Sequence, residues 1–280
     1  MNHYELFLFW LTLGLQVLLC ALVYIRGIER RLPFFTIYAT LLIAGTLGIQ
    51  LVYLHFGFRS ATSYYAAWIT TGVHVIAQSL AIAELCRYEL RAYRGIWALT
   101  WRVLALLAVF FLGHAAMDAW GQPDRIAIYG LTLERDFGIA SVVILLALFL
   151  IRNYYDLWLE PLQKWIAVGM CFFCIIDVVN NTVLRDAFTQ YLSLWFFTRY
   201  TLFWSEMKSE VVRANELWSA VRASAFVVSL SLWCFALRKP LPAPAEEPVL
   251  LPAEVYGELS PAVNLRLRAF NDRLLELLRS

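Results

Sequence analysis

Apolar residues arrive in blocks of about twenty along this chain, and short segments that carry arginine separate the blocks. An α-helix needs about 20 predominantly apolar residues to cross a hydrocarbon layer about 30 Å thick. The pattern therefore predicts an all-α, polytopic membrane protein with seven transmembrane helices. The predicted helices cover Glu5–Ile25, Phe34–Phe56, Tyr64–Cys86, Ile96–Met117, Phe137–Arg152, Leu162–Val183 and Leu217–Leu237.

Composition and charge exclude several other classes of protein. Hydrophobic residues make up 61% of the chain and charged residues 16%, whereas an average soluble domain has about 25% charged residues. The formal net charge of +2 is too small to favour a nucleic-acid partner. All five cysteines fall inside apolar blocks, so they do not predict a disulfide framework. We interpret the CxxC sequence of Cys171 and Cys174 as packing rather than as a metal or redox site.

The distribution of basic residues predicts the orientation. The chain before the first block has no lysine or arginine, and no signal-peptide cleavage site follows, so we expect this block to remain as the first helix. Arginine and lysine concentrate in the first, third and fifth connections and after the seventh block. Against this pattern, the sixth connection carries Arg185, Arg199, Lys208 and Arg213. The positive-inside rule then places the N-terminus outside the cell membrane and the C-terminal tail in the cytoplasm.

One further apolar segment, from Tyr191 to Trp204, does not fit this count. It is short, and Arg199 lies inside it. Apolar stretches of about 10 to 14 residues are more often interfacial than spanning. We expect a helix that lies on the outer surface. If the segment crossed instead, the chain would make eight crossings and the tail would lie outside.

The tail that follows the bundle of residues 1–239 has two predicted parts. Residues 240–259 are proline-rich and predict an extended linker. Residues 260–280 predict a cytoplasmic amphipathic helix with Ser260 as its cap. Its apolar face consists of Val263, Leu267, Phe270, Leu274 and Leu277. This helix either packs on the bundle and the lipid headgroups, or binds a cytoplasmic protein or a second copy of the chain in a homo-oligomer.

Ionisable groups inside membrane spans are costly, which makes them default candidates for function. Here they concentrate in the predicted outer halves of the helices, and the candidate ligand-binding residues are His74, His114, Asp177, Asn180, Asn181 and Arg222. We predict a buried ion pair between Asp177 and Arg222, which lie at similar depth on successive antiparallel helices. These groups either line a polar cavity or only tie helices together. For His114, Asp118 and Asp136 we favour the structural role.

No catalytic or cofactor signature accompanies these groups. The sequence contains no HExxH, no GxSxG and no phosphate-binding loop. A haem between His74 and His114 would need both rings at one depth, but their predicted depths differ by about 10 Å. We therefore expect no catalytic residues, no metal site and no cofactor.

Several stretches resemble a set of uncharacterised bacterial seven-helix membrane proteins of similar length. The matching stretches are Arg30–Phe35, Glu84–Gly95, Leu133–Arg135, Trp233 and Asn271–Leu278. Their general pattern is similar to the membrane sensor regions that precede bacterial kinases, although this tail is too short for a kinase or cyclase domain. The resemblance implies the seven-helix topology and little more.

Together these features favour a non-enzymatic sensor or interaction subunit. It would detect a ligand in the outer half, or a partner in the lipid bilayer, and present its C-terminal helix to the cytoplasm. Two alternatives stay open, a small-solute or lipid transporter and an accessory subunit of a larger membrane complex. Transporters usually have helices broken by glycine or proline at equivalent positions in two halves, and the seven blocks do not show this pattern.

Overall fold

The computed structural model describes residues 3–57, 60–90, 94–121, 125–155, 161–197, 204–238, 269 and 271–277. Almost all of these residues are helical. The elements in chain order are α1 (His3–Ile25), the short 3-10 helix η1 (Ile28–Arg30), α2 (Pro33–Phe56), α3 (Ala61–Glu89), α4 (Arg94–Asp118), α5 (Arg125–Tyr155), α6 (Pro161–Phe197) and α7 (Trp204–Leu237).

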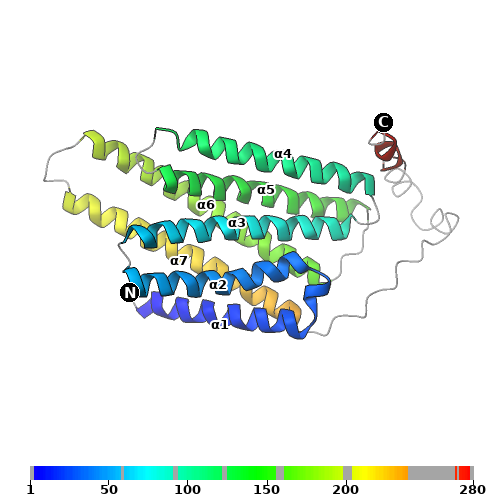
Figure 1. Ribbon diagram of the computed structural model, residues 1–280, viewed down its shortest axis with the longest axis horizontal. Helices are drawn as coiled ribbons and strands as arrows, with labels where there is room; N and C mark the ends of the chain where they lie inside the picture. The colour runs from blue at the N-terminus through cyan, green and yellow to red at the C-terminus, as the bar shows by residue number, and fades with distance from the viewer. Residues whose placement is uncertain are drawn as a thin grey trace.

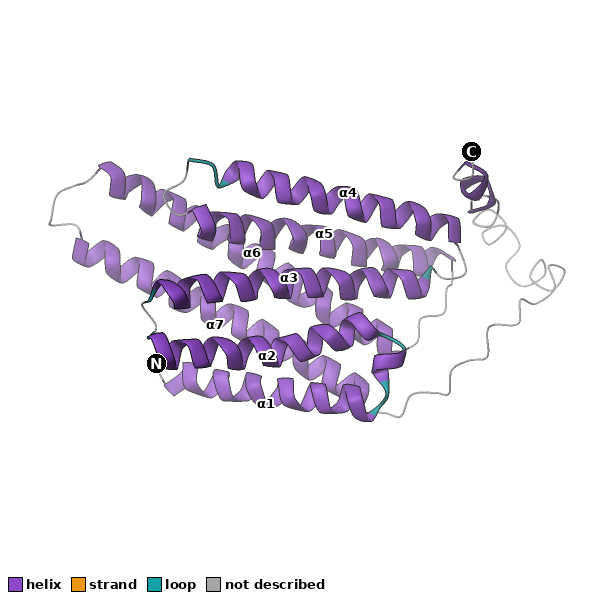
Figure 2. Cartoon of the chain, viewed as in Figure 1, coloured by secondary structure: helices purple, strands orange, loops and turns teal. Residues whose placement is uncertain are grey.

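The long helices pack as a ring with one helix outside it. Neighbours follow the order α1, α2, α3, α5, α6 and α7, and α7 closes the ring onto α1. α4 packs mainly on α5 at the outer edge of the bundle (Figure 1). Because successive helices alternate in direction, the start of α1 and the end of α7 lie at opposite ends of the bundle (Figure 2).

Six of the helices contain segments long and apolar enough to cross a membrane, so the chain is a polytopic membrane protein. The segments are Leu6–Ile25, Pro33–Phe56, Ala61–Glu89, Arg94–Asp118, Pro161–Val183 and Ser219–Leu237. α5 is not among them, although a long apolar stretch follows Glu134, Arg135 and Asp136 in its sequence. The all-α, polytopic prediction is confirmed, whereas the seventh crossing and the orientation remain predictions.

The predicted helix boundaries agree with the structure for α1 to α4, within one helical turn, and differ for α5 to α7. α5 begins at Arg125 rather than Phe137, α6 ends at Phe197 rather than Val183, and α7 begins at Trp204 rather than Leu217. Hydropathy marks only the stretch that suits hydrocarbon. A helix continues as far as its packing and hydrogen bonds support it, so helices that carry charges turn out longer than predicted.

The segment from Tyr191 to Trp204 is not the separate surface helix that the sequence predicts. Residues 191–197 continue α6, residues 198–203 lie outside the described residues, and Trp204 begins α7. With 37 residues, α6 is about 55 Å long, well beyond a hydrocarbon layer of about 30 Å. α6 and α7 accordingly extend past the other helices at the end where the N-terminus lies (Figure 1).

Trp233 of α7 is fully buried and joins three helices. Its ring packs edge-on against Phe35 and Tyr38 of α2. Its Nε1 donates a hydrogen bond to the carbonyl oxygen of Ile166 in α6 at 3.1 Å. Gly169 of α6 lies against the indole, because a β-carbon here would sit 3.0 Å from Trp233 Cδ1. The close approach of α6 and α7 therefore depends on a residue without a side chain.

Polar contacts join helix ends at the opposite end of the bundle from the N-terminus. The Glu84 carboxylate of α3 accepts the backbone N–H groups of Phe34 and Phe35, at 3.1 and 2.9 Å. The first N–H groups of a helix lack partners within the helix, and its positive end favours a carboxylate. Arg26 donates to the carbonyl oxygen of Arg238 at 2.8 Å. These contacts fix the ends of α1, α2, α3 and α7.

We predict that Gly169→Ala destabilises the bundle by about 1–3 kcal/mol, the usual cost of overpacking a filled core. The added methyl group would overlap Trp233, which other contacts hold in place. The midpoint of thermal unfolding in detergent measures the effect. Gly113→Ala in α4 is the matched control, because a β-carbon at Gly113 meets nothing within 4 Å. An equal loss of stability in both variants would contradict the interpretation.

Candidate functional site

Charged side chains from α5, α6 and α7 meet in a group that we call the central cluster. It consists of Glu134, Asp177, Asn181 and Arg222. The two Nη atoms of Arg222 donate to the two carboxylate oxygens of Glu134, and Nε lies 3.3 Å from Asp177 Oδ1. Asn181 Nδ2 donates to Glu134 at 3.1 Å and to Asp177 at 3.3 Å. Two carboxylates thus share one guanidinium and one amide.

The central cluster is largely shielded from solvent. The side chains of Glu134 and Asp177 are 6% and 7% exposed, and that of Arg222 is 26% exposed. The cluster residues of α6 and α7 lie within candidate membrane spans. Taking a charge out of water is expensive, so each charge depends on its partners in the cluster. The cluster therefore holds α5, α6 and α7 together, whatever else it does.

The predicted ion pair of Asp177 and Arg222 is confirmed, but Arg222 has a second partner that the sequence analysis missed. Sequence reasoning places Glu134 in the connection before the fifth helix. In the structure Glu134 lies inside α5 and accepts hydrogen bonds from both Nη atoms of Arg222. Ligand binding by these residues remains a prediction.

A spacing pattern in α5 points to Glu134 from the sequence alone. Residues on the inner face of α5 follow one another at intervals of three and four, and they are Ala127, Leu131, Glu134, Gly138, Ser141, Leu145 and Leu148. Such intervals are typical of the buried face of a helix. The series starts well ahead of Phe137, so it predicts a longer helix with Glu134 facing inward.

His74 takes part in a contact between α2 and α3. Its Nε2 lies 3.0 Å from the carbonyl oxygen of Leu41, and its ring packs closely on Gly45. His74 also lies within electrostatic range of the central cluster. Asn180 is half-buried in α6, next to the cluster asparagine. His74 therefore lies near the cluster, and Asn180 is the neighbour of Asn181 along the chain.

His114 belongs to a separate polar contact between α4 and α5. Its Nδ1 lies 2.6 Å from Asp136 Oδ2, and Arg135 donates to Asp136 Oδ1 at 2.9 Å. Near the end of α4, Asp118 accepts a hydrogen bond from Thr132 at 2.6 Å. These contacts attach the end of α4 to α5. They agree with the structural role predicted for His114, Asp118 and Asp136.

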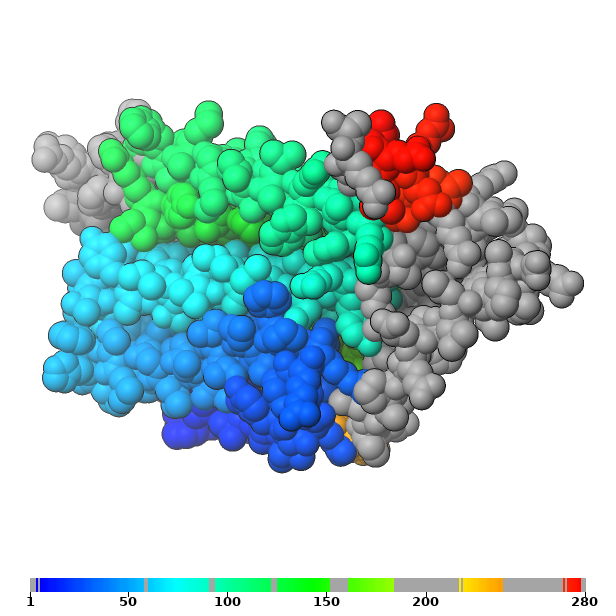
Figure 3. Space-filling view, turned by 45° about the vertical axis from the view of Figure 1, so that its right-hand side comes forward, coloured from blue at the N-terminus to red at the C-terminus, as the bar shows by residue number. Residues whose placement is uncertain are grey.

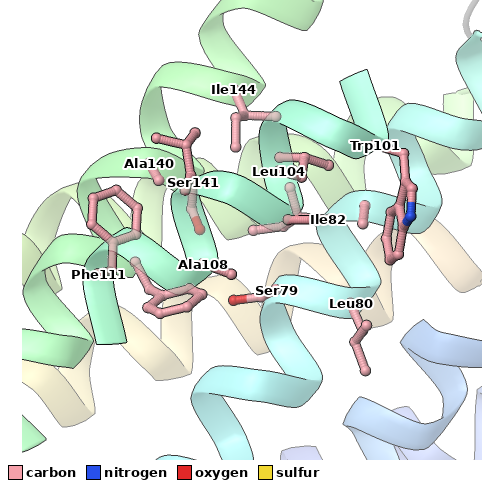
Figure 4. A pocket seen from close by; sticks show the side chains of 14 residues that line it. Ser79, Leu80, Ile82, Trp101, Leu104, Ala108, Phe111, Ala140, Ser141 and Ile144 are labelled. Carbon is pink, nitrogen blue, oxygen red and sulfur yellow. The ribbon is translucent and has the colours of Figure 1, made fainter. Parts of the chain in front are cut away.

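A cavity of about 150 Å³ opens between α3, α4 and α5 (Figure 4). Apolar side chains line most of it, including Ile82, Trp101 and Phe111, and Ser79 and Ser141 add two hydroxyl groups. A lining of this kind suits an apolar group such as an acyl chain better than a charged ligand. None of the predicted ligand-binding residues lines this cavity.

The CxxC sequence lies inside α6 and takes part in packing. Cys171 and Cys174 are both buried and free, and Gln78 of α3 donates a hydrogen bond to Cys174 Sγ at 2.9 Å. Within the described ranges, no three His, Cys, Asp or Glu side chains are grouped so that they could hold a metal ion.

The described part of the C-terminal helix, residues 271–277, docks at the start of α4 (red in Figure 3). The Gly95 N–H donates to Asn271 Oδ1 at 2.8 Å, and a β-carbon at Gly95 would lie 2.7 Å from the Asn271 main-chain oxygen. Of the predicted apolar face, Leu274 is half-buried and Leu277 is 67% exposed. The other three residues, Val263, Leu267 and Phe270, lie outside the described residues.

Comparisons with protein-family models, with curated proteins and with solved structures found no match to this chain. The resemblance to bacterial seven-helix proteins and to sensor regions therefore remains a prediction. Function has to be argued from the residues themselves.

We predict that a double-mutant cycle of Glu134→Gln and Arg222→Gln gives an interaction energy of about 1–3 kcal/mol. The parallel cycle of Asp177→Asn and Arg222→Gln should give a smaller value, because Asp177 Oδ1 faces Arg222 Nε at 3.3 Å without a hydrogen bond. Thermal unfolding of the purified variants measures both cycles. Additive effects of the two substitutions in the first cycle would count against the central cluster as one unit.

Proposed function

We propose that this chain is a non-enzymatic sensor or interaction subunit of a bacterial inner membrane, in which α4 couples the two ends of the bundle. One observation carries the proposal. α4 begins at its contact with Asn271 of the C-terminal helix and ends at the contacts of His114 and Asp118 with α5. Between these contacts, α4 is the least buried of the six candidate spans. A helix attached at both ends and weakly packed between them is suited to transmit a displacement.

The coupling requires that α4 has two positions and that a ligand binds one of them better. The proposed ligand-binding residues are those named from the sequence, with Glu134 added from the structure. The partner-binding element is the C-terminal helix, whose apolar face would meet a cytoplasmic protein or a second copy of the chain. The main hydrophobic core leaves α4 free for this role, because within the described residues it draws on every other long helix and not on α4.

The proposal includes seven crossings, with α5 as the seventh. α5 has 31 residues and stands between α3 and α6 in the ring. Its charges are paired inside the bundle, Glu134 with Arg222, and Asp136 with His114 and Arg135. Paired and buried charges make a membrane crossing far less costly than charges that face lipid. The concentration of basic residues at the tail end supports a cytoplasmic C-terminus.

We predict that His114→Gln increases amide hydrogen exchange in residues 271–277, at the opposite end of α4. Glutamine does not reproduce the 2.6 Å contact of the imidazole Nδ1 with Asp136 Oδ2, so the end of α4 loosens. The His114 side chain is 44% exposed, so the fold should survive. The increase should reach at least about fivefold, the lower end of typical allosteric coupling. Exchange of the full chain in lipid nanodiscs, followed by mass spectrometry, measures it.

Two variants control this experiment. Leu106→Ala also lies on α4, but Leu106 is 71% exposed, so its exchange pattern should stay normal. Asn271→Ala removes the hydrogen bond from the Gly95 N–H and should directly raise amide exchange both at Gly95 and in residues 271–277. If residues 271–277 exchange at the wild-type rate in His114→Gln, coupling through α4 is ruled out.

We predict that alkaline phosphatase fused after Ser280 is inactive in intact bacterial cells and that green fluorescent protein fused there is fluorescent. Seven crossings from an outside N-terminus leave the tail in the cytoplasm. Fusions after Leu90 and Gly121 serve as references, because they should report the cytoplasm and the outside respectively. An active phosphatase after Ser280 would mean an even number of crossings and would contradict this topology.

A further inference from the structure

The charges of the central cluster do not balance. One guanidinium, that of Arg222, faces the two carboxylates of Glu134 and Asp177. Asn181 donates hydrogen bonds to both carboxylates but adds no charge. Counted over the residues that the structure describes, the cluster with both carboxylates ionised would carry one excess negative charge at a buried position between membrane helices. Such a charge is costly, and binding one positive charge removes the cost.

The two carboxylates are not equally stabilised. Glu134 receives hydrogen bonds from both Nη atoms of Arg222 and from Asn181. Asp177 Oδ2 receives a bond from Asn181 at 3.3 Å. Asp177 Oδ1 accepts none within the described part of the chain, although the residue is only 5% exposed and Oδ1 points at the cluster. Hydrogen bonds to a carboxylate disfavour its protonation, so the open position is Asp177 Oδ1.

We propose that Asp177 Oδ1 is a binding site for one proton, which neutralises the central cluster inside the membrane. The proton comes from water, adds to a lone pair of the carboxylate and returns to water on release, so no other bond changes. A metal cation fits the same charge deficit less well, because it would lie beside Arg222 Nε, 3.3 Å from the same oxygen. This inference concerns the charge of the cluster and does not depend on coupling through α4.

Among the described residues, four other titratable groups lie within electrostatic range of Asp177 or Arg222, and they come from four helices. They are Glu134 on α5, Tyr38 on α2, His74 on α3 and Cys174 on α6 itself. Of these four, His74 is the one that becomes a cation when it gains a proton. A proton on His74 would neutralise the cluster without protonating a carboxylate, and the experiment has to separate these two arrangements.

Infrared difference spectroscopy of the full chain in lipid nanodiscs, recorded as pH is varied, separates them. A protonated carboxylic acid has a carbonyl band at higher frequency than the bands of a carboxylate. The wild type should show one such band that disappears as pH rises, and Asp177→Asn should lack it. Glu134→Gln should also lack it although Asp177 is present, because the cluster then holds one positive and one negative charge.

Asp136→Asn is the matched control. Asp136 is also a buried carboxyl group in the bundle, but Arg135 at 2.9 Å and His114 at 2.6 Å supply it with partners. The band should therefore persist in Asp136→Asn.

Thermal unfolding of the same variants gives an independent measurement. If the folded chain holds a proton that the unfolded chain has released, stability falls as pH rises, by about a factor of ten in the unfolding equilibrium constant per pH unit. The wild type should show this fall in its unfolding midpoint. Asp177→Asn and Glu134→Gln should not show it, since neither gains a proton at the cluster on folding.

Several results would overturn the proposal. The wild-type spectrum alone decides it if no protonated-carboxyl band appears at any pH at which the chain is folded, and this holds even if Asp177→Asn fails to fold. A band that survives Asp177→Asn would place the proton on another residue. A pH-dependent stability without any band would place it on His74. Loss of the band on addition of sodium chloride at constant pH would show a cation site instead.

Discussion

The contact of Arg222 with two carboxylates inside the membrane determines how three helices are rotated about their axes. Lipid tails are as apolar as leucine, so burial of apolar surface alone gives a membrane helix little reason to present one face inward. A charge gives a strong reason. A rotation of about 100°, one residue of helix, would turn Glu134 away from Arg222, and a charge that faces lipid costs about 2.5–3.5 kcal/mol. The central cluster thus specifies the register of α5, α6 and α7.

The short stretches on which the predicted resemblance rests share one physical feature in the structure. Each stretch supplies a group that satisfies a partner from another part of the chain. Two backbone N–H groups in Arg30–Phe35 donate hydrogen bonds to Glu84, which belongs to the stretch Glu84–Gly95. The N–H group of Gly95 in turn donates to Asn271, the first residue of the stretch Asn271–Leu278. Leu133–Arg135 contains Glu134, the partner of Arg222, and Trp233 donates to a carbonyl oxygen of α6.

The sequence predicts α1 to α4, in which the apolar stretch covers nearly the whole helix, and fails for α5 to α7, which extend well beyond their apolar stretches. α1 to α4 could be placed within one turn, because their apolar stretches and their helices coincide. The pair of Asp177 and Arg222 could be predicted, because both residues interrupt apolar blocks at matching depth. Glu134 could not be found by hydropathy, because three consecutive charged residues make its surroundings look like a loop. In the structure these three residues lie inside α5, and Glu134 pairs with Arg222, which lies far away in the sequence.

The position of α4 outside the ring has a thermodynamic consequence. The six ring helices share the hydrophobic core, and three of them also share the central cluster, so a displacement of any ring helix disturbs packed or charged contacts. Close-packed protein interiors resist small shifts of one element against another. α4 contributes to neither group within the described residues, and its polar contacts lie at its two ends. A displacement of α4 therefore costs less free energy than that of a ring helix. Any signal that passes along this bundle meets the least resistance through α4.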